Sequence, residues 1–267
     1  MKYDLIISDF DGTLGIAPGN IDEETVKTVK EYVKAGGKFV ICTGRMFYSI
    51  QNVCKKYGID GICIAYQGAM INEINSGKSL FMGGIEPELA AEITEKLLAE
   101  NVQVIVDIDD VLYYQEYSPY VEFYEKAVGV TGIKVESLTK TTLKINKPVQ
   151  KAAAICDPKT TKILTDKYNS LYGGKLIFNN GSDKLVEVIS PKCSKGFAVR
   201  YMADYYNIPL DKVMAIGDST NDIELLKGEW HGVAVGDAVQ ELKDIAKEIT
   251  VPFKEKPVKL LIEKYCL

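Results

Sequence analysis

The sequence predicts an α/β protein built on a doubly wound parallel sheet, with an α+β domain inserted into it. Short apolar strands alternate with amphipathic helices near both ends of the 267-residue chain. That alternation is typical of a parallel sheet covered by helices on both faces. Between residues 82 and 189 closely spaced strands replace it, which indicates a separate α+β unit. We therefore expect a core domain formed by 1–81 and 190–267, and a second domain formed by 82–189.

The first part of the core shows the alternation most clearly. Apolar runs bounded by turn residues predict buried strands at 5–7, 38–42 and 61–65. Apolar residues at helical spacing predict a helix at 22–35, which Gly36 and Gly37 end, and another follows at 49–57. This β-α-β-α-β order predicts neighbouring parallel strands.

The inserted region is expected to pair its strands differently. A helix is predicted at 86–99, followed by a hairpin of strands 102–106 and 111–114. Asp107, Asp109 and Asp110 would form the solvated tip of that hairpin, because aspartate favours turns. Further strands are expected near 142–145, 152–156, 176–178 and 185–189, with helices near 120–127 and 159–172.

The core alternation resumes at Ser194, which is expected to cap a helix running to residue 206. Strands are predicted at 213–216, at 232–235 and near 249. Helices are predicted from 239 and at 258–265, so that the chain closes on the domain in which it began.

Composition narrows the classes of function. Apolar residues make up 46% and charged residues 26%, as in ordinary globular proteins. A formal charge of -5 without a basic stripe argues against a nucleic-acid partner. No apolar run approaches the length of a membrane span, and the first residues enter a strand rather than a signal peptide. We expect a cytoplasmic monomer or homodimer with no membrane partner.

Cysteine and histidine usage limits the chemistry further. The six cysteines form no Cys-x-x-Cys pair and lie mostly in apolar surroundings, which predicts reduced, buried thiols. His231 is the only histidine, and no Gly-x-Ser-x-Gly sequence accompanies it. Proton transfer must therefore fall to carboxylates, lysine or metal-bound water.

Two aspartates follow the first predicted strand with one residue between them. Asp9 and Asp11 would point to the same side of an extended chain, and Gly12 then allows a turn. Two carboxylates that close repel each other unless a proton or cation lies between them. Taken alone, the pair fits an aspartate-rich turn that caps backbone N–H groups as well as it fits a site.

Three predicted strands end in polar, glycine-containing loops, at 9–13, 43–45 and 217–222. In an open parallel sheet, ligands bind beyond the carboxyl ends of the strands. These loops would bring together Asp9, Asp11 and Asp218, with Asp222 one helical turn later, and such oxygen clusters suit Mg2+. Thr43, Asn221 and exposed N–H groups add donors for a phosphate. Lys195, in the first turn of its helix, adds a positive charge.

Four motifs occur in a defined order, and together they are highly specific. They are Asp9-Phe10-Asp11-Gly12-Thr13-Leu14, Thr43-Gly44-Arg45, Ser194-Lys195-Gly196 and Gly217-Asp218-Ser219-Thr220-Asn221-Asp222. In this order they resemble the haloacid dehalogenase (HAD) superfamily. More narrowly, the chain is similar to the Cof-type phosphatases of subfamily IIB, whose α+β cap is inserted between the second and third motifs. The resemblance covers nearly the whole chain and implies a Rossmann-like core.

The resemblance also implies a role for each matching residue. Asp9 would be the nucleophile that forms an aspartyl-phosphate, and Asp11 the general acid and then the base. Phe10, Thr43, Gly44, Lys195 and Asn221 would bind the phosphate. Mg2+ would be held by Asp9, the main-chain carbonyl of Asp11 and Asp218, with Asp222 supporting them.

Two segments depart from the family pattern. Gln67-Gly68-Ala69 stands where the family often has Asn-Gly-Ala, so a site role for Gln67 is left open. The family's Asn-x-Glu-Asp-Gly-Val segment is replaced here by residues 251–258, and any contact it makes in relatives is in doubt.

The resulting hypothesis is a Mg2+-dependent phosphatase of small phosphorylated metabolites, with sugar phosphates as the expected substrates. One alternative is a phosphomutase of the same superfamily, which would return an isomeric phosphate rather than free phosphate. Another is a metabolite-binding regulator that kept the site but lost turnover. The presence of every expected catalytic residue argues against this last possibility.

Overall fold

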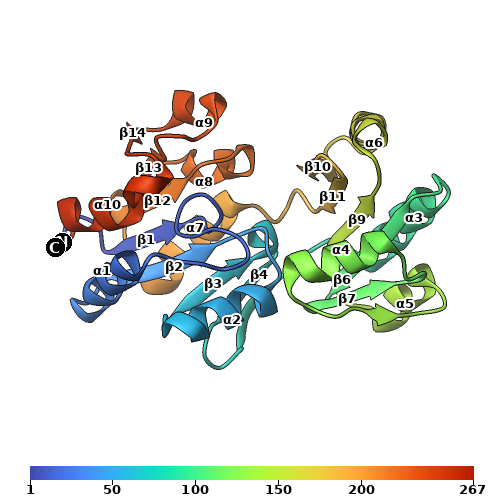
Figure 1. Cartoon of the computed structure of the whole chain (residues 1–267), viewed down its shortest axis with the longest axis horizontal. Helices are drawn as coiled ribbons and strands as arrows, with labels where there is room; N and C mark the ends of the chain where they lie inside the picture. Colours follow the sequence, from blue (N-terminus) through green and yellow to red (C-terminus); the bar gives the residue numbers. More distant parts are fainter. The chain divides into compact units, whose positions relative to one another are not determined.

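The computed structural model describes residues 1–267, which form two compact units joined by two crossings of the chain (Figure 1). The first unit contains Met1–Phe81 and Ser194–Leu267, and the second contains Met82–Cys193. The second crossing lies four residues beyond the expected position at 190. Cys193, whose N–H bonds to Ser190 O, is the last residue of the second unit.

The first unit contains an eight-stranded sheet in the order β14-β13-β12-β1-β2-β3-β4-β5 (Figure 1). Its first six strands in this order are parallel. The strands are β1 (Leu5–Ser8), β2 (Lys38–Cys42), β3 (Ile62–Ala65), β4 (Met70–Glu73), β5 (Ser79–Met82), β12 (Val213–Gly217), β13 (His231–Ala234) and β14 (Glu248–Ile249). The order reverses at β1, and a sheet of this kind leaves a crevice at that point.

Strands β1, β3 and β12 are buried along their whole length. Because side chains alternate between the two faces of a strand, both faces of the sheet are covered. The covering elements are α1 (Glu23–Lys34), α2 (Phe47–Tyr57), α7 (Lys195–Tyr206), α8 (Ile223–Leu226), α9 (Gln240–Ile245), α10 (Pro257–Tyr265) and the short 3-10 turns η1 (Tyr66–Gly68), η2 (Leu210–Lys212), η3 (Thr220–Asp222) and η4 (Phe253–Glu255). The predicted fold class is confirmed.

The hairpin of β4 and β5 was not expected from the sequence. β4 pairs antiparallel with β3 and extends the sheet beyond its parallel part. The connection from β3 to β4 is short. Tyr66, Gln67 and Gly68 all have positive φ and reverse the chain within three residues. Strand propensity is weak in segments of four residues, and a turn reached through non-glycine residues with positive φ has no clear sequence signal.

The second unit contains a six-stranded sheet in the order β10-β11-β9-β6-β7-β8. Its strands are β6 (Gln103–Ile108), β7 (Val111–Tyr114), β8 (Ile133–Lys134), β9 (Val149–Ile155), β10 (Ile177–Ser182) and β11 (Leu185–Ile189), and its helices are α3 (Pro87–Leu98), α4 (Pro119–Val128), α5 (Leu138–Ile145) and α6 (Pro158–Tyr172). All pairs except β7 and β8 are antiparallel, including the predicted hairpin of β6 and β7. The α+β character of the insertion is confirmed.

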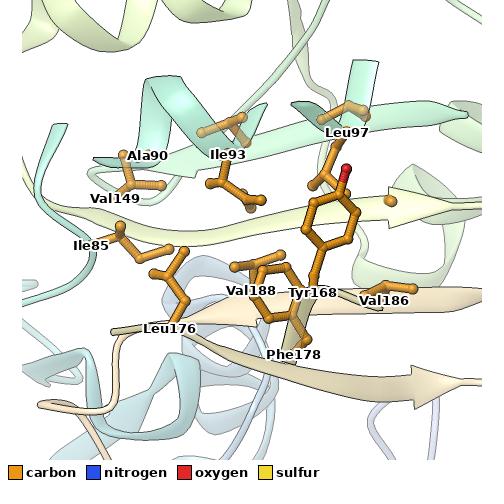
Figure 2. Close-up of a cluster of buried hydrophobic side chains, with 14 of the residues drawn as sticks. Ile85, Ala90, Ile93, Leu97, Val149, Tyr168, Leu176, Phe178, Val186 and Val188 are labelled. Atoms are coloured by element: carbon orange, nitrogen blue, oxygen red, sulfur yellow. The ribbon is translucent and has the colours of Figure 1, made fainter. Parts of the chain in front are cut away.

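One face of this sheet packs against helices to form the core of the second unit (Figure 2). Ile93 and Leu97 of α3 lie over β9, while Tyr168 of α6 stacks on Phe178 of β10 with ring centroids 5.4 Å apart. These aromatic side chains bury large apolar areas, which stabilise the unit independently of the first sheet.

The strand predicted at 142–145 is wrong, because this segment belongs to helix α5. Its threonines and Ile145 resemble a strand pattern, since β-branched residues favour strands. Ser137 nevertheless starts a helix by accepting a hydrogen bond from Lys140 N, and Asn146 ends it in the left-handed conformation. Leu138 and Thr142, four residues apart, are the buried pair.

The expected solvated aspartate turn is wrong for Asp107. Only Asp109 and Asp110 form the tip, whereas Asp107 lies in β6 and is 1% exposed. Neither of its carboxylate oxygens accepts a hydrogen bond, and Lys151 Nζ lies 3.9 Å away while binding Glu187 at 2.9 Å. Burial raises the pKa of Asp107 to about 7, and the charge of Lys151 only partly opposes this shift.

This pKa predicts a stability that falls as the pH rises. Between pH 3.8, the ordinary pKa of aspartate, and about pH 7, folded Asp107 keeps a proton that the unfolded chain releases. The free energy of unfolding therefore falls as the pH rises toward 7. We expect the difference in free energy of unfolding between Asp107→Asn and the wild type to shift in favour of the variant by on the order of 2 kcal/mol from pH 5 to pH 8. Chemical denaturation at both pH values measures this, with Asp183→Asn in an exposed turn as the control. A difference between the two proteins that stays the same from pH 5 to pH 8 would contradict the prediction.

Two smaller expectations can be compared with the structure. All six cysteines are buried and free of disulfides, as the sequence predicted. None of the helices combines the length and the apolar character needed to cross a bilayer.

Candidate active site

The chain leaves β1 at Ser8 and immediately forms a tight loop at the carboxyl end of the sheet. Asp9 N still bonds to Ile216 O of β12, which places Asp9 at the reversal of strand order. The carbonyl of Phe10 then accepts hydrogen bonds from the N–H groups of Thr13, Leu14 and Gly15. Asp9 is therefore presented by a rigid turn and is only 5% exposed.

Lys195 provides the countercharge for Asp9. Its Nζ lies 2.5 Å from Asp9 Oδ1 and 2.6 Å from Asp222 Oδ1, and the side chain is 1% exposed. Burial and the neighbouring Asp222 raise the pKa of Asp9, whereas Lys195 lowers it. The two carboxylates raise the pKa of Lys195 despite its burial, so the ammonium remains charged.

The loop after β12 supplies the other two carboxylates. Asp222 Oδ2 accepts from the N–H groups of Asp218 and Ser219 at 3.0 and 3.1 Å, so both of its oxygens are occupied. Asp218 Oδ1 accepts from the hydroxyl of Thr13 at 2.8 Å, which links this loop to the one after β1. A Cβ at Gly12, where φ is +80°, would lie 2.5 Å from Asp218 Oδ2, so this close approach requires glycine.

The three carboxylates suit a hard cation. Oxygens of Asp9, Asp218 and Asp222 lie within 4.8 Å of one another. Asp9 and Asp218 each accept a hydrogen bond through Oδ1, from Lys195 and Thr13, while Asp222 accepts through both oxygens. Burial raises the pKa of Asp218 to about 6, and the hydrogen bond from Thr13 and the charge of Lys195 only partly oppose this shift. The donor set thus fits a divalent cation that takes a few carboxylates and completes its shell with water.

Hydrogen-bond donors predicted to bind phosphate surround the same edge. Thr43 is 1% exposed and its hydroxyl accepts from Arg45 N at 3.2 Å, which leaves the hydroxyl proton available. The side chain of Phe10 is fully buried, so only its main-chain N–H could serve an anion. Asn221 is exposed in η3 beside Asp222. These positions agree with donors for a phosphate, although their roles remain predictions.

The structure gives different cationic partners to the two aspartates that the sequence analysis expected to converge. The carboxylate of Asp11 is not part of the cluster, and its side chain is 48% exposed. It forms a bidentate ion pair with Arg45 instead. Arg45 is the residue that the sequence reasoning missed, although it completes the Thr43-Gly44-Arg45 motif and is one of only two arginines in the chain.

The two departures from the family pattern lie in different places. Gln67, with φ +58°, donates its N–H to Thr43 O, and a Cβ at Gly44 would overlap its side-chain amide. It therefore lies beside the second motif. The 251–258 segment bonds to the end of β13 through Gly236 N and to α1 through Lys256, whose Nζ lies 2.9 Å from Glu24. This segment holds the C-terminal helix to the core.

A doubly wound sheet that gathers three aspartates and a buried lysine at one carboxyl edge defines an α/β protein with a site suited to a cation and an anion. A family model described as haloacid dehalogenase-like hydrolase matches residues 6–262, and the chain belongs to that family. Its membership in the HAD superfamily, expected from the motifs, is confirmed.

Two curated relatives that match over nearly their whole length carry phosphatase names. The chain is 27% identical over 274 residues to a Haemophilus influenzae protein provisionally named a phosphatase, covering 99% of this chain and 98% of that protein. It is 24% identical over 287 residues to phosphatase YwpJ of Bacillus subtilis, covering 95% and 96%. Together with the family, these relatives identify a phosphoric monoester hydrolase.

Solved structures share the complete fold. A crystal structure from Thermotoga maritima matches with a TM-score of 0.86 at 24% identity, covering 98% of this chain and 97% of that one. A HAD subclass IIB sugar phosphatase matches with a TM-score of 0.80 at 18% identity, covering 98% of both. The expected Cof-type IIB architecture of core and inserted α+β domain is confirmed.

Proposed function

We propose that this protein is a Mg2+-dependent phosphatase that hydrolyses small phosphorylated metabolites through an aspartyl-phosphate, with sugar phosphates as its expected substrates. The observation that carries the proposal is the arrangement around Asp9. Its Oδ1 is held by buried Lys195, and carboxylate oxygens of Asp9, Asp218 and Asp222 lie within 4.8 Å of one another. Mg2+ bound there would neutralise charge on Asp9 and on the phosphate.

In the first step, a carboxylate oxygen of Asp9 forms a bond to phosphorus while the bond from phosphorus to the ester oxygen breaks. Asp11 donates a proton to the leaving oxygen, which departs as an alcohol. Lys195, the hydroxyl of Thr43 and the amide of Asn221 would hold the other phosphoryl oxygens. An anionic nucleophile can approach an anionic phosphate only if such donors stabilise the transition state.

In the second step, water attacks the phosphorus of the aspartyl-phosphate and the bond to Asp9 breaks. Asp11, now a carboxylate, accepts the proton of that water, and inorganic phosphate leaves. The enzyme returns to its starting state, with Asp9 ionised beside Lys195. The second domain, which we propose to be the cap, would supply substrate specificity.

The substrate class takes its support from relatives. The chain is 23% identical over 238 residues to HMP-PP phosphatase of Klebsiella pneumoniae, covering 88% of this chain and 85% of that protein. The sugar phosphatase described above shares the fold. Both are named for small phosphorylated molecules, and we extend that class to this protein.

A phosphatase screen tests the proposal. The purified protein is offered sugar, nucleotide and cofactor phosphates with Mg2+ or with a chelator, and inorganic phosphate is measured. We expect Mg2+-dependent release of phosphate from a subset of the panel. An isomeric sugar phosphate with little free phosphate would identify a phosphomutase. No product from any ester, or from an activated aryl phosphate, would indicate a binding protein without turnover.

The cation site makes a separate prediction at Asp218. Asp218→Asn keeps an oxygen for the hydroxyl of Thr13 but removes a charge with no other function in the fold. We expect the Mg2+ concentration for half-maximal activity to rise at least about tenfold, because each anionic ligand contributes strongly to affinity for a hard cation. Titration with Mg2+ measures this, with Asp211→Asn in the exposed turn η2 as the control. An unchanged half-saturation value would place the cation elsewhere.

A further inference from the structure

Two nitrogen atoms of the Arg45 guanidinium bind the two carboxylate oxygens of Asp11. Its Nε donates to Asp11 Oδ2 at 2.8 Å, and its Nη2 donates to Asp11 Oδ1 at 2.6 Å. Two parallel charge-assisted bonds of this kind determine the direction of a carboxylate as well as its position. Asp11 makes no other side-chain hydrogen bond, so Arg45 alone sets its orientation.

Arg45 is itself held at several points. Its Nη1 donates to Pro18 O at 2.8 Å, and its guanidinium lies over the ring of Phe10, 4.7 Å from the centroid. The main chain is held as well, because Thr43 Oγ1 accepts from Arg45 N and Arg45 O accepts from Tyr66 N. The side chain is 13% exposed, against 48% for Asp11. Arg45 is therefore fixed by several contacts, whereas the orientation of the Asp11 carboxylate depends on Arg45.

The residue type supports a geometric role. The chain contains 32 lysines and arginines, of which only Arg45 and Arg200 are arginine. Both guanidinium groups lie over aromatic rings, Arg45 over Phe10 and Arg200 over Trp230. A lysine could supply the charge at position 45, but it could not contact both carboxylate oxygens and Pro18 O at once.

We propose that Arg45 is the positioning residue of Asp11, an inference that rests on the proposed phosphatase function. Arg45 keeps Asp11 apart from the buried carboxylate of Asp9, so that each aspartate has its own cation: Lys195 for Asp9 and Arg45 for Asp11. During the reaction one Asp11 oxygen turns to the ester oxygen, while Arg45 retains the other. Arg45 acts through Asp11 and does not contact the phosphate.

The leaving group tests this role. An alkyl phosphate needs a proton on its departing oxygen, whereas an activated aryl phosphate does not. For Arg45→Gln we expect the single-turnover rate of alcohol release from alkyl phosphates to fall at least about tenfold, and the single-turnover rate of phenol release from an activated aryl phosphate, which reports the first step alone, to change less than about threefold. KM should stay the same for both. Equal losses for both classes, or a raised KM, would assign Arg45 to phosphate binding and overturn the proposal.

Two further variants sharpen the test. In an Asp11→Asn background, Arg45→Gln should cost nothing more on alkyl phosphates, because a residue that acts through Asp11 has no effect once Asp11 is gone. Arg45→Lys keeps the positive charge but lacks the paired donors of a guanidinium. Its activity on alkyl phosphates should therefore lie between that of Arg45→Gln and that of the wild type. Arg200→Lys is the matched control and should match the wild type. If the activity losses of Asp11→Asn and Arg45→Gln multiply in the double variant, the positioning role of Arg45 is contradicted.

A crystal structure of Arg45→Gln gives a readout that does not depend on turnover. We expect Asp11 to lose its single orientation while Asp9 and Lys195 stay in place. An unchanged, well-ordered Asp11 would overturn the positioning role even if no substrate were found. Failure of the proposed function appears separately, as absence of phosphate release by the wild type.

Discussion

Replacing Asp9 with asparagine should abolish turnover and leave the fold intact. The expected loss in kcat is at least about 10^4-fold, the scale seen when a covalent nucleophile is removed. Asparagine has the same shape and can still accept a hydrogen bond from Lys195, but its amide does not attack phosphorus. Phosphate release from an activated aryl phosphate measures the effect.

The fold should tolerate this change because the lost charge is an unfavourable one. Burial and Asp222 both disfavour ionised Asp9, as the direction of its pKa shift shows. We expect the thermal midpoint of Asp9→Asn to equal or exceed that of the wild type. Asp211→Asn, which is exposed, is the control for both measurements. Full activity of Asp9→Asn would exclude the aspartyl-phosphate route.

Replacing Lys195 with methionine should cause the largest combined loss of stability and activity. Lys195→Met would leave Asp9 and Asp222 buried without their shared cation. Removing one partner of a buried ion pair costs about 3–5 kcal/mol, because the remaining charge is neither hydrated nor paired. kcat should fall at least about 10^2-fold, since a donor to the transferred phosphoryl group is also lost.

A second substitution separates charge imbalance from a simple loss of packing. In Lys195→Met/Asp222→Asn the excess negative charge is gone, while asparagine keeps an oxygen for the N–H groups of Asp218 and Ser219. We expect this double variant to regain about half of the lost stability. Denaturant titration measures it, with exposed Lys192→Met as the control. A Lys195→Met protein as stable as the wild type would refute the charge argument.

Much of the fold could be predicted because buried parallel strands need apolar side chains at every position. Apart from exposed Lys38 of β2 and from Ser8 of β1, the strands β1, β2, β3 and β12 carry buried residues without charge, and each was expected within a residue or two of its observed bounds. Ser194 caps α7 as predicted, through its hydrogen bond from Phe197 N. These features depend on local composition and on neighbours along the chain.

The second domain was predicted less well, because its short segments carry conflicting signals. The threonines of α5 favour a strand, yet the cap at Ser137 and the packing of Leu138 make a helix. Asp107 looked like a turn residue among its neighbours but is buried by the pairing of β6 with β9. In both cases long-range packing overrode local preference.

The sequence by itself determined which chemical groups this protein brings to its site: the aspartates, the lysine, the threonine and their order along the chain. Only the tertiary structure decided how those groups pair. The expectation that Asp9 and Asp11 converge assumed a strand, in which residues two apart share a side. β1 ends at Ser8, and the turn through Gly12 sends Asp11 to Arg45 while Asp9 stays with Lys195. The sequence identified the charged residues, but which of them pair with one another depended on the residue at which β1 ends.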